Sequence, residues 1–366
     1  MLPTLWIGVF PELSGIGGVQ QVSRQMGAVL AEAARERNIA CELFGLNDAH
    51  GPGSFQQAGQ TCNFRGFARD KVSLFLRLLG LAPRIDRIYL AHVNLAPLAW
   101  LLRRIHPRIR YWVVAHGIEV WQPLPLLRRF ALRGARGIFS VSSATKTSLV
   151  FAQRVPAANV AVLAPALEPA FVQANCDGQL ALPPGRFLLT VGRLVASEPG
   201  KGVDSVIHVL PDLVKVVPDL FYIIVGEGDL RPELEKLASE SPARDRVIFL
   251  GELPLEQLKH CYSRCELFVM PSRQEGFGLV FLEAMALGKP VIAGCIGGAT
   301  EIVKNGVTGF LVVPGDLEML ALHLTRLLDD EALRERMGDA GRKRVAENYG
   351  FQTYRAKLKS ILNESE

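Results

Sequence analysis

The sequence has no CxxC pair, no Asp-x-Asp motif and no long uninterrupted apolar run. Its six cysteines are scattered along the chain: Cys41, Cys62, Cys176, Cys261, Cys265 and Cys295. Without a second pair to complete a zinc site, we expect these thiols to be reduced and structural. The apolar segment 88–102 contains His, Asn and Pro and is shorter than the ~20 residues that a membrane span requires. These absences disfavour a disulfide scaffold, a zinc protein and a membrane-spanning protein.

The length and composition are typical of a folded protein with two domains. The chain has 366 residues, 49% of them hydrophobic, with ordinary aromatic and charged fractions. The stretch MLPTLWIGVFP has no positive leader and no small-residue cleavage site, so we interpret it as a first strand. We expect a cytoplasmic protein that is peripheral at the inner face of the membrane.

Charge is distributed unevenly between the two halves. Residues 1–183 hold 19 of the 41 Lys and Arg residues but 10 of the 36 Asp and Glu residues, which leaves that half at +9 and the remainder at −4. Such asymmetry indicates an anionic partner for the first half. Nucleic acid is disfavoured because no RNA- or DNA-binding motif is present and the second half is acidic.

Short apolar runs alternate with amphipathic helical patterns throughout the chain. LWIGVF, RIYLAH, RYWVVAH and GIFSVS are predicted strands of the first half, and RFLLTVG, LFYIIVG, RVIFLG and CELFVMP of the second. This alternation predicts doubly wound parallel sheets covered on both faces. We predict Rossmann-like domains over 1–180 and 184–350, joined by the Pro/Gly segment 177–186, with a last helix over about 351–366 that packs back on the first domain.

Two glutamates interrupt the apolar, glycine-rich segment PSRQEGFGLVFLEAMALGKPVIA, residues 271–293. A helix is predicted from near Gly278, so the amides of Gly278 and Leu279 would form an anion site at a helix N-terminus. Glu275 precedes this site, and Glu283 lies about one turn inside, where its oxygens could accept bonds from a ribose diol. A nucleotide sugar offers these groups in that order. The alternative is a helix cap and a structural ion pair.

The segment TVGRLVASEPGKGVD, residues 190–204, carries two cations on a glycine-rich loop. Arg193 follows a predicted strand, and Lys201 stands between two glycines before a predicted helix. Such a pair can neutralise a diphosphate leaving group. The alternative is an ordinary solvated loop.

Two features of the first half also follow predicted strands. His116 comes at the end of a buried strand, where a structural hydrogen bond and a functional role are equally expected. SGIGGVQQVSR, with Gly17 and Gly18, is similar to a dinucleotide fingerprint, but Gln20 occupies the third glycine position. Nicotinamide binding is therefore disfavoured, and a mobile glycine loop is predicted.

Together these segments resemble the retaining glycosyltransferases of the GT4 family, which have the GT-B fold. The resemblance rests on GRL…GKG, on the glutamates eight apart in 275–283, and on GGATEIV, GVTGFLV, GGVQ and AHGIEVW. It covers nearly the whole chain and implies two Rossmann-like domains that face each other across a cleft.

The resemblance implies how a nucleotide-sugar donor would be held. Arg193 and Lys201 would bind the diphosphate and Glu283 the ribose, while the amides of Gly278 and Leu279 would meet phosphate and sugar. The resemblance assigns the remaining donor contacts as follows: Glu275 and Phe277 to the sugar ring, His116 to a sugar hydroxyl, Gly17 and Gly18 to the donor phosphate, and Leu253 to the base. Of these residues, His116, Glu275, Arg193 and Lys201 would be catalytic.

The implied reaction moves a hexose from GDP-mannose or a UDP-sugar to a glycan or a polyprenyl-pyrophosphate-linked acceptor, with retention of configuration. The lack of an Asp-x-Asp motif predicts that no metal or other cofactor takes part. Two alternatives remain at this point: a sugar-nucleotide epimerase, and an inactive scaffold that binds nucleotide sugars.

Arginines and apolar residues are interleaved in the first half. The basic residues of this region are Arg103, Arg104, Arg108, Arg110, Arg128, Arg129 and Arg133. They predict a basic, partly apolar face that contacts an anionic membrane surface, with solvated helix faces as the equally weighted alternative.

Overall fold

The computed structural model describes residues 4–169, 171, 180–196 and 200–364. Backbone contacts divide the chain into unit 1, which ends at Ala166 and includes the C-terminal helix from Phe351, and unit 2, Leu167–Gly350. The division lies ahead of the predicted linker 177–186, of which 177–179 fall outside the described residues. Its physical basis is a change of hydrogen-bond partners, because the Ala166 carbonyl accepts bonds from unit 1 and the Leu167 amide donates to Tyr349 of unit 2 at 2.8 Å.

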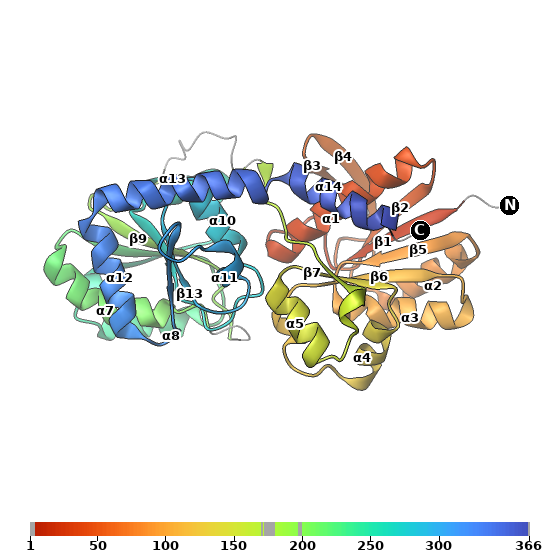
Figure 1. The fold of residues 1–366 in the computed structure, drawn as a ribbon, viewed down its shortest axis with the longest axis horizontal. Coiled ribbons are helices and arrows are strands. Elements are labelled where there is room, and N and C mark those ends of the chain that lie inside the picture. Colours follow the sequence, from red (N-terminus) through yellow and green to blue (C-terminus); the bar gives the residue numbers. More distant parts are fainter. Residues whose placement is uncertain (1–3, 170, 172–179, 197–199, 365–366) are drawn as a thin grey trace. The chain divides into compact units, whose positions relative to one another are not determined.

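Unit 1 contains an eight-stranded sheet in the order β3-β4-β2-β1-β5-β6-β7-β8 (Figure 1). Its strands are β1 (Leu5–Phe10), β2 (Ala40–Gly45), β3 (Gly51–Gln57), β4 (Gln60–Gly66), β5 (Ile85–Leu90), β6 (Arg110–Ala115), β7 (Gly137–Ser140) and β8 (Val160–Val162). Its helices are α1 (Gly18–Glu36), α2 (Lys71–Leu81), α3 (Ala96–Ile105), α4 (Leu126–Arg133), α5 (Ser143–Phe151) and α14 (Phe351–Glu364). Short 3-10 turns lie at Ala82–Arg84, Val93–Leu95, Ile118–Val120 and Ala157–Asn159.

The sheet of unit 1 is parallel except at one edge, where β3 pairs antiparallel with β4. The sequence did not predict this hairpin. Side chains of both strands alternate between exposed and buried, so neither strand forms a continuous apolar run. The two-residue turn places Ala58 and Gly59 at positive φ, which suits the twist of a tight hairpin.

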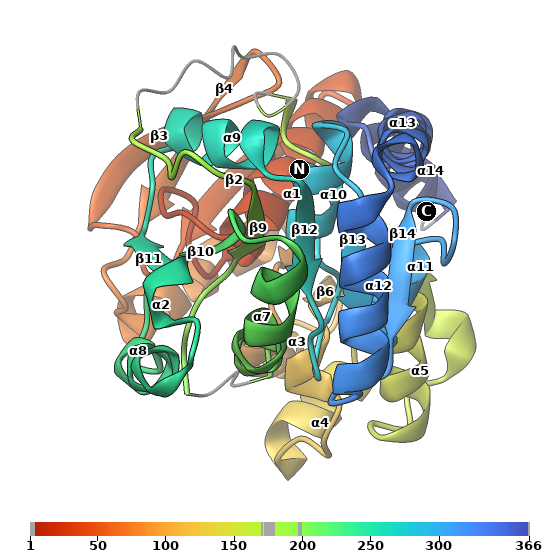
Figure 2. The same cartoon turned by 90° about the vertical axis from the view of Figure 1, so that its left-hand side faces the viewer.

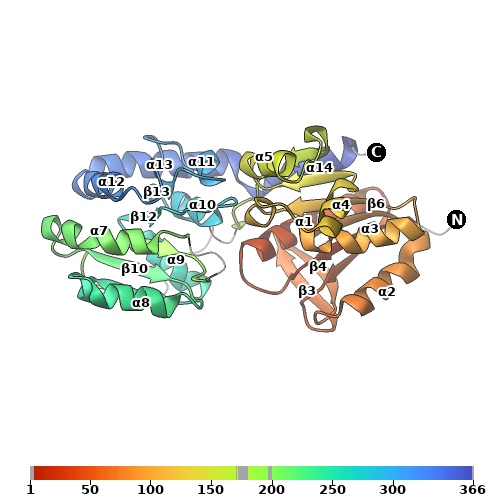
Figure 3. The same ribbon diagram turned by 90° about the horizontal axis from the view of Figure 1, so that it is seen from below.

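Both faces of this sheet are buried, which explains the unbroken apolar strands. Leu5, Ile7 and Val9 of β1 share a core with α2, α3, α4 and α5, and Figure 3 looks onto the side that carries α2 and α3. Trp6 lies on the opposite face, where the Arg87 guanidinium sits 4.9 Å from its ring centre. Arg87 also donates to the Leu362 carbonyl of α14 at 3.1 Å, so α14 covers this face.

Unit 2 contains a six-stranded, wholly parallel sheet in the order β11-β10-β9-β12-β13-β14 (Figure 2). Its strands are β9 (Phe187–Val191), β10 (Phe221–Val225), β11 (Val247–Gly251), β12 (Leu267–Met270), β13 (Val291–Gly294) and β14 (Gly309–Val312). Its helices are α7 (Val203–Val216), α8 (Arg231–Glu240), α9 (Leu255–Arg264), α10 (Leu279–Ala286), α11 (Ala299–Ile302), α12 (Leu317–Asp329) and α13 (Glu331–Asn348), with a 3-10 turn at Arg244–Arg246.

The two faces of the unit 2 sheet are covered by different helices. One core joins Leu188, Ile224 and Val269 of the strands to apolar side chains of α7 and α12. On the other face Phe268 packs edge-on against Phe281 of α10 at 5.8 Å, and α13 lies on α10. The predicted doubly wound α/β architecture is thus confirmed for each unit. Within the described ranges, none of the helices is long and apolar enough to span a bilayer.

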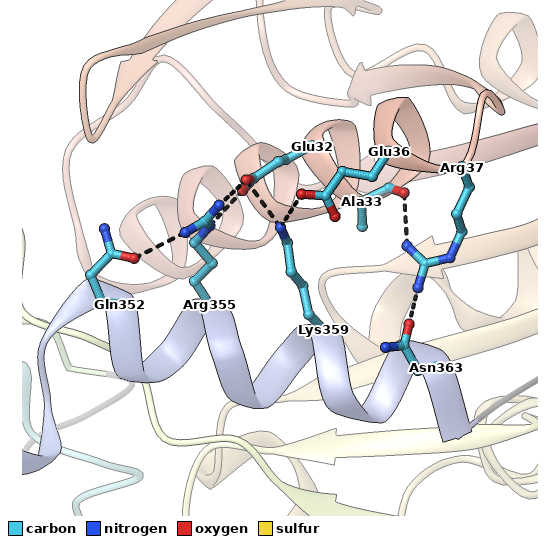
Figure 4. Close-up of polar contacts among 8 residues, drawn as sticks. All are labelled: Glu32, Ala33, Glu36, Arg37, Gln352, Arg355, Lys359 and Asn363. Atoms are coloured by element: carbon cyan, nitrogen blue, oxygen red, sulfur yellow. Dashed lines mark hydrogen bonds and ion pairs between the residues drawn. The ribbon is translucent and has the colours of Figure 1, made fainter.

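Salt bridges fasten the returning helix α14 to α1 within unit 1 (Figure 4). Arg355 forms a two-pronged contact with Glu32, with Nε 2.7 Å from Oε2. Lys359 reaches Glu32 at 3.0 Å and Glu36 at 2.7 Å, and Arg37 donates to Asn363. The hydrogen bond from Arg355, together with the hydrogen bond and charge of Lys359, lowers the pKa of Glu32 to about 2, although burial acts to raise it.

We expect Glu32→Gln to destabilise unit 1 at neutral pH and to do so less as the solution becomes acidic. A carboxyl whose pKa falls from 4.5 to about 2 on folding stabilises the protein fully above pH 4.5 and loses that contribution as pH falls toward 2. Thermal unfolding of both proteins at several pH values measures the difference. Glu42→Gln, which removes a single surface pair with Arg77, serves as control and should change stability little. A constant difference between pH 7 and pH 3 would contradict this assignment.

Candidate active site

The loops that follow β9 and β12 carry most of the residues predicted to act. These strands are neighbours at the centre of the unit 2 sheet, so their carboxyl ends deliver both loops to one edge. Parallel α/β sheets bind ligands at that edge. Arg193 and Lys201 lie on the loop after β9, whose residues 197–199 fall outside the described ranges, and Glu275 lies on the loop after β12.

The two loops are locked together. The Arg273 amide donates to the Gly200 carbonyl at 2.5 Å, and the Arg273 guanidinium pairs with Asp204 at 2.9 Å. Gly202 has a φ of 77°, and a side chain there would lie 2.6 Å from the Pro271 carbonyl oxygen. The glycines flanking Lys201 therefore permit a close backbone approach that fixes where the lysine points.

Lys201 and Glu275 form an ion pair across this junction. The Lys201 Nζ donates to the Glu275 Oε2 at 3.3 Å, and their side chains are only 16% and 10% exposed. A carboxylate buried to this degree requires a charged or hydrogen-bonding partner. Lys201 also lines a shallow hollow of about 200 Å³ together with Arg193 and Arg273. The structure thus brings the two predicted phosphate-binding cations to one hollow, beside the predicted sugar-binding carboxylate.

The helix that follows begins as the sequence predicts. Gly278 has a φ of 103°, and a side chain there would collide with the Phe281 ring at 2.4 Å. The left-handed residue turns the chain into α10 at Leu279, where the first amides of the helix have no carbonyl partner within it. A side chain at Gly298 would lie 2.4 Å from the Phe277 Cα, so glycine permits the close approach of these two loops.

Glu283 occupies a different environment one turn into α10. The Tyr262 hydroxyl donates to its Oε2 at 2.8 Å. Burial raises the pKa of Glu283 to about 7, the tyrosine bond opposes that rise, and the Glu168 charge adds to it. The carboxyl therefore titrates near neutral pH, which is typical of functional sites.

The remaining predicted donor contacts of unit 2 lie close by in the fold. Phe277 is largely buried and packs edge-on against Tyr349 with ring centres 6.0 Å apart. Leu253 is half-buried in the loop between β11 and α9. Neither position tests the predicted contact with sugar or base, so both contacts stay predictions.

His116 of unit 1 follows β6 and is held from two sides. Its backbone amide donates to Glu119 at 2.6 Å, and its ring Nε2 lies 2.7 Å from the Ala91 carbonyl oxygen. A carbonyl only accepts, so Nε2 carries a proton and Nδ1 is the remaining polar atom of the ring.

The sequence interpretation missed a second histidine at this edge, His92. Its ring stacks on His116 at 5.6 Å, and its Nδ1 accepts the Asn94 amide. Burial lowers the pKa of His92 to about 4, helped by the charge of His116 and opposed by that of Glu119. His92 is thus neutral at physiological pH. Like His116, His92 stands at the end of a predicted buried strand. That shared position could have identified His92 from the sequence.

The glycine loop after β1 is fastened at its base. Asp48 accepts the amides of Leu13 and Ser14 at 2.9 and 2.8 Å, and Arg24 donates to the Gly15 carbonyl at 2.8 Å. Gly17 has a φ of 139°, and α1 begins at Gly18. The structure places these glycines at a helix start and leaves their contact with a donor phosphate as a prediction.

Residues 177–344 match the family described as Glycosyl transferases group 1. The chain is 33% identical over 290 residues to GDP-mannose-dependent alpha-(1-6)-phosphatidylinositol monomannoside mannosyltransferase of Mycolicibacterium smegmatis, with 75% of each protein covered. It is 30% identical over 266 residues to alpha-D-kanosaminyltransferase of Streptomyces kanamyceticus, covering 71% of this chain and 67% of that protein.

Solved structures share the architecture. Sucrose-phosphate synthase from Thermosynechococcus elongatus has a TM-score of 0.77 at 22% identity, covering 99% of this chain and 98% of that one. HepE of Anabaena, solved with UDP, has a TM-score of 0.72 at 19% identity, covering 99% and 100%. The fold is thus that of the GT-B glycosyltransferases. The chain belongs to the group 1 glycosyl transferases, which confirms the GT4-type resemblance of its motifs, and it is a glycosyltransferase.

We expect Glu283→Gln to gain stability relative to the natural protein as pH rises. Below pH 4.5 the carboxyl is protonated in both the folded and unfolded states, but between 4.5 and about 7 only the unfolded state ionises. The natural protein should therefore lose up to about 3 kcal/mol of unfolding free energy across this window, and the loss should level off above it. Chemical denaturation at graded pH tests this, with the exposed Glu335→Gln as control. Parallel pH profiles for the natural protein and Glu283→Gln would refute it.

Proposed function

We propose that this glycosyltransferase moves a hexose from a nucleoside-diphosphate sugar to a glycan or polyprenyl-pyrophosphate-linked acceptor, with retention of configuration. The observation that carries the proposal is the Lys201–Glu275 pair at 3.3 Å beside Arg193, at the carboxyl edge of the unit 2 sheet. Relatives named as GDP-mannose-dependent mannosyltransferases and neighbours solved with UDP support a nucleotide-sugar donor. GDP-mannose and UDP-sugars are therefore the donors to test.

The chemical demand of this reaction is the charge on the departing diphosphate. Negative charge grows on the leaving group while the sugar becomes oxocarbenium-like. Arg193, Lys201 and the first amides of α10 are proposed to stabilise that charge, since preorganised donors lower the barrier most where charge develops. When a diphosphate takes over Lys201, Glu275 becomes available to hydroxyls of the sugar ring.

The other residues orient the donor. Glu283 is proposed to accept hydrogen bonds from the ribose diol, which favours its ionised form, and His116 to meet a sugar hydroxyl through Nδ1. Gly17 and Gly18 are assigned to the donor phosphate, Phe277 to the sugar and Leu253 to the base. We propose that no metal takes part, because two cations already serve the diphosphate and the sequence has no Asp-x-Asp motif. The leaving diphosphate itself would accept the acceptor's proton on the same face.

Unit 1 supports a contact with an anionic membrane surface. The packed helices α3 and α4 carry Arg103, Arg104, Arg128 and Arg129, and they also expose large apolar side chains. These exposed residues are Leu101, Ile105, Leu126, Leu127 and Phe130. Basic and apolar side chains on one helical surface are typical of interfacial binding, and a surface contact would deliver a lipid-linked acceptor.

We expect Lys201→Ala and Glu275→Ala each to lower transfer roughly 10²–10³-fold, the usual cost of one contact to developing charge. A thermal-shift panel of GDP- and UDP-sugars first identifies the donor, and turnover is then measured with it. Lys201→Ala leaves the buried Glu275 carboxylate without its cation, which destabilises the fold. The double variant Lys201→Ala with Glu275→Ala removes both charges, and it tests whether activity is lost while the protein remains folded. Lys215→Ala, which removes an exposed surface lysine paired with Asp212, is the matched control. Near-normal turnover of both single variants would overturn the site.

We expect Leu127→Ser with Phe130→Ser to weaken flotation with vesicles of phosphatidylglycerol and phosphatidylcholine at low salt, because both side chains are at least half exposed on α4. Phe151→Ser, on α5 and 79% exposed, should leave flotation unchanged. If the natural protein does not float with anionic vesicles at low salt, the membrane contact is wrong.

A further inference from the structure

Four arginines line a hollow at the edge of the unit 1 sheet opposite His116. The hollow has a volume of about 370 Å³. Its lining residues are Arg103, Arg110, Arg133, Gly134, Ala135, Arg136 and Asn159. Arg110 is the first residue of β6, whereas His116 follows its last residue. At about 3.3 Å per residue, the six residues of β6 separate the two positions by roughly 20 Å. The hollow is therefore distinct from the carboxyl-edge residues assigned to transfer.

Arg103 and Arg133 are each held by a side-chain hydrogen bond that uses few of the donors of the guanidinium. Arg103 donates to the Gly134 carbonyl at 2.6 Å, and Arg133 donates through Nε to the Gln153 carbonyl at 2.9 Å. Each guanidinium has five N–H donors in a rigid fork, so most donors stay available. Fixed guanidiniums lose little freedom when they bind, which favours a ligand.

Positive charge in the hollow exceeds the negative charge beside it. Asp86 pairs with Arg110 at 2.7 Å and also contacts Arg87. Within the part of the chain that the structure describes, no carboxylate pairs with Arg103, Arg133 or Arg136. Like charges brought together without counter-charge repel one another, and a bound polyanion removes that repulsion.

We infer that this hollow is a second anion site that binds a phosphate ester or diphosphate group. The arginine fork matches the oxygens of a phosphate and binds it in two-pronged fashion. The volume of about 370 Å³ suits a phosphorylated headgroup or a small phosphorylated metabolite. The inference does not depend on the proposed transfer reaction, because it rests on unit 1 alone.

The test is binding of inorganic pyrophosphate by the full chain, measured by titration calorimetry. Lys201→Ala is the background, because it weakens pyrophosphate binding at the proposed donor site and leaves the unit 1 hollow unchanged. Adding Arg103→Gln and Arg136→Gln should raise the dissociation constant about tenfold or more for each lost charged contact. The matched control adds Arg65→Gln and Lys71→Gln. Both cations are exposed: Arg65 lies on β4, which is remote from β6 in the sheet order, and Lys71 is the first residue of α2, which follows β4 in the chain. Unfolding of each unliganded variant checks that the fold is kept.

A second arm distinguishes a lipid headgroup from a soluble phosphate compound. Vesicles of phosphatidylglycerol and phosphatidylcholine are sedimented with each protein at low salt. Arg103 also lies on the α3–α4 surface proposed to contact the membrane, so Arg136→Gln alone is used in this arm. If both pyrophosphate and vesicle binding depend on Arg136, the ligand is a lipid headgroup. If only pyrophosphate binding depends on Arg136, the ligand is a soluble phosphorylated compound. Absence of pyrophosphate binding, or an equal loss in the Arg65 and Lys71 control, overturns the inference.

Discussion

The Lys201–Glu275 ion pair is the contact on which the arrangement of unit 2 depends. A carboxylate with a side chain only 10% exposed requires a charged or hydrogen-bonding partner, and Glu275 has a cation from the loop of a neighbouring strand. The pair therefore fixes two loops relative to each other, with Arg273 and the close approach at Gly202 completing the junction. A diphosphate that replaces Glu275 as the partner of Lys201 would be bound and would free the carboxylate in one exchange.

The two glutamates of this segment are eight residues apart and have different physical states. Glu275 faces an ammonium group, so its charge is compensated. Glu283 accepts a hydrogen bond from the hydroxyl of Tyr262, and burial raises its pKa to about 7. The same segment thus supplies an ion-paired carboxylate, Glu275, just before α10 and a carboxyl with a pKa near neutral pH, Glu283, one turn inside the helix. The division of labour follows from what surrounds each residue, since the side chains are identical.

In unit 1 the histidine pair and the arginine hollow are separated by the length of a strand. The histidine pair His92–His116 lies at the carboxyl ends of β5 and β6, and the arginine hollow lies at the amino end of β6. The C-terminal helix α14 belongs to this unit through Glu32, Arg355 and Lys359, although the whole of unit 2 precedes it in sequence. Folding of the sheet thus gathers part of the excess positive charge of the first half into the arginine hollow.

Every strand predicted from a continuous apolar run is present, because strands buried on both faces must be apolar throughout. β2, β3, β4, β8, β13 and β14 were not predicted from the sequence. In β3 and β4 the reason is that exposed and buried side chains alternate, so neither forms a continuous apolar run. Motif spacing also predicted roles for Arg193, Lys201, Glu275 and Glu283, and the structure brings Arg193, Lys201 and Glu275 together while their roles stay predictions.

The sequence alone determined the α/β class and the glycosyltransferase family, because local pattern and spacing encode these, and it predicted which residues hold a donor. The partner of each charged group could be known only from the tertiary structure. Lys201 meets Glu275 across 74 positions, Tyr262 meets Glu283 across 21, and Arg355 meets Glu32 across 323. Such pairs form when strand order and helix packing bring distant segments together, and no local pattern specifies them.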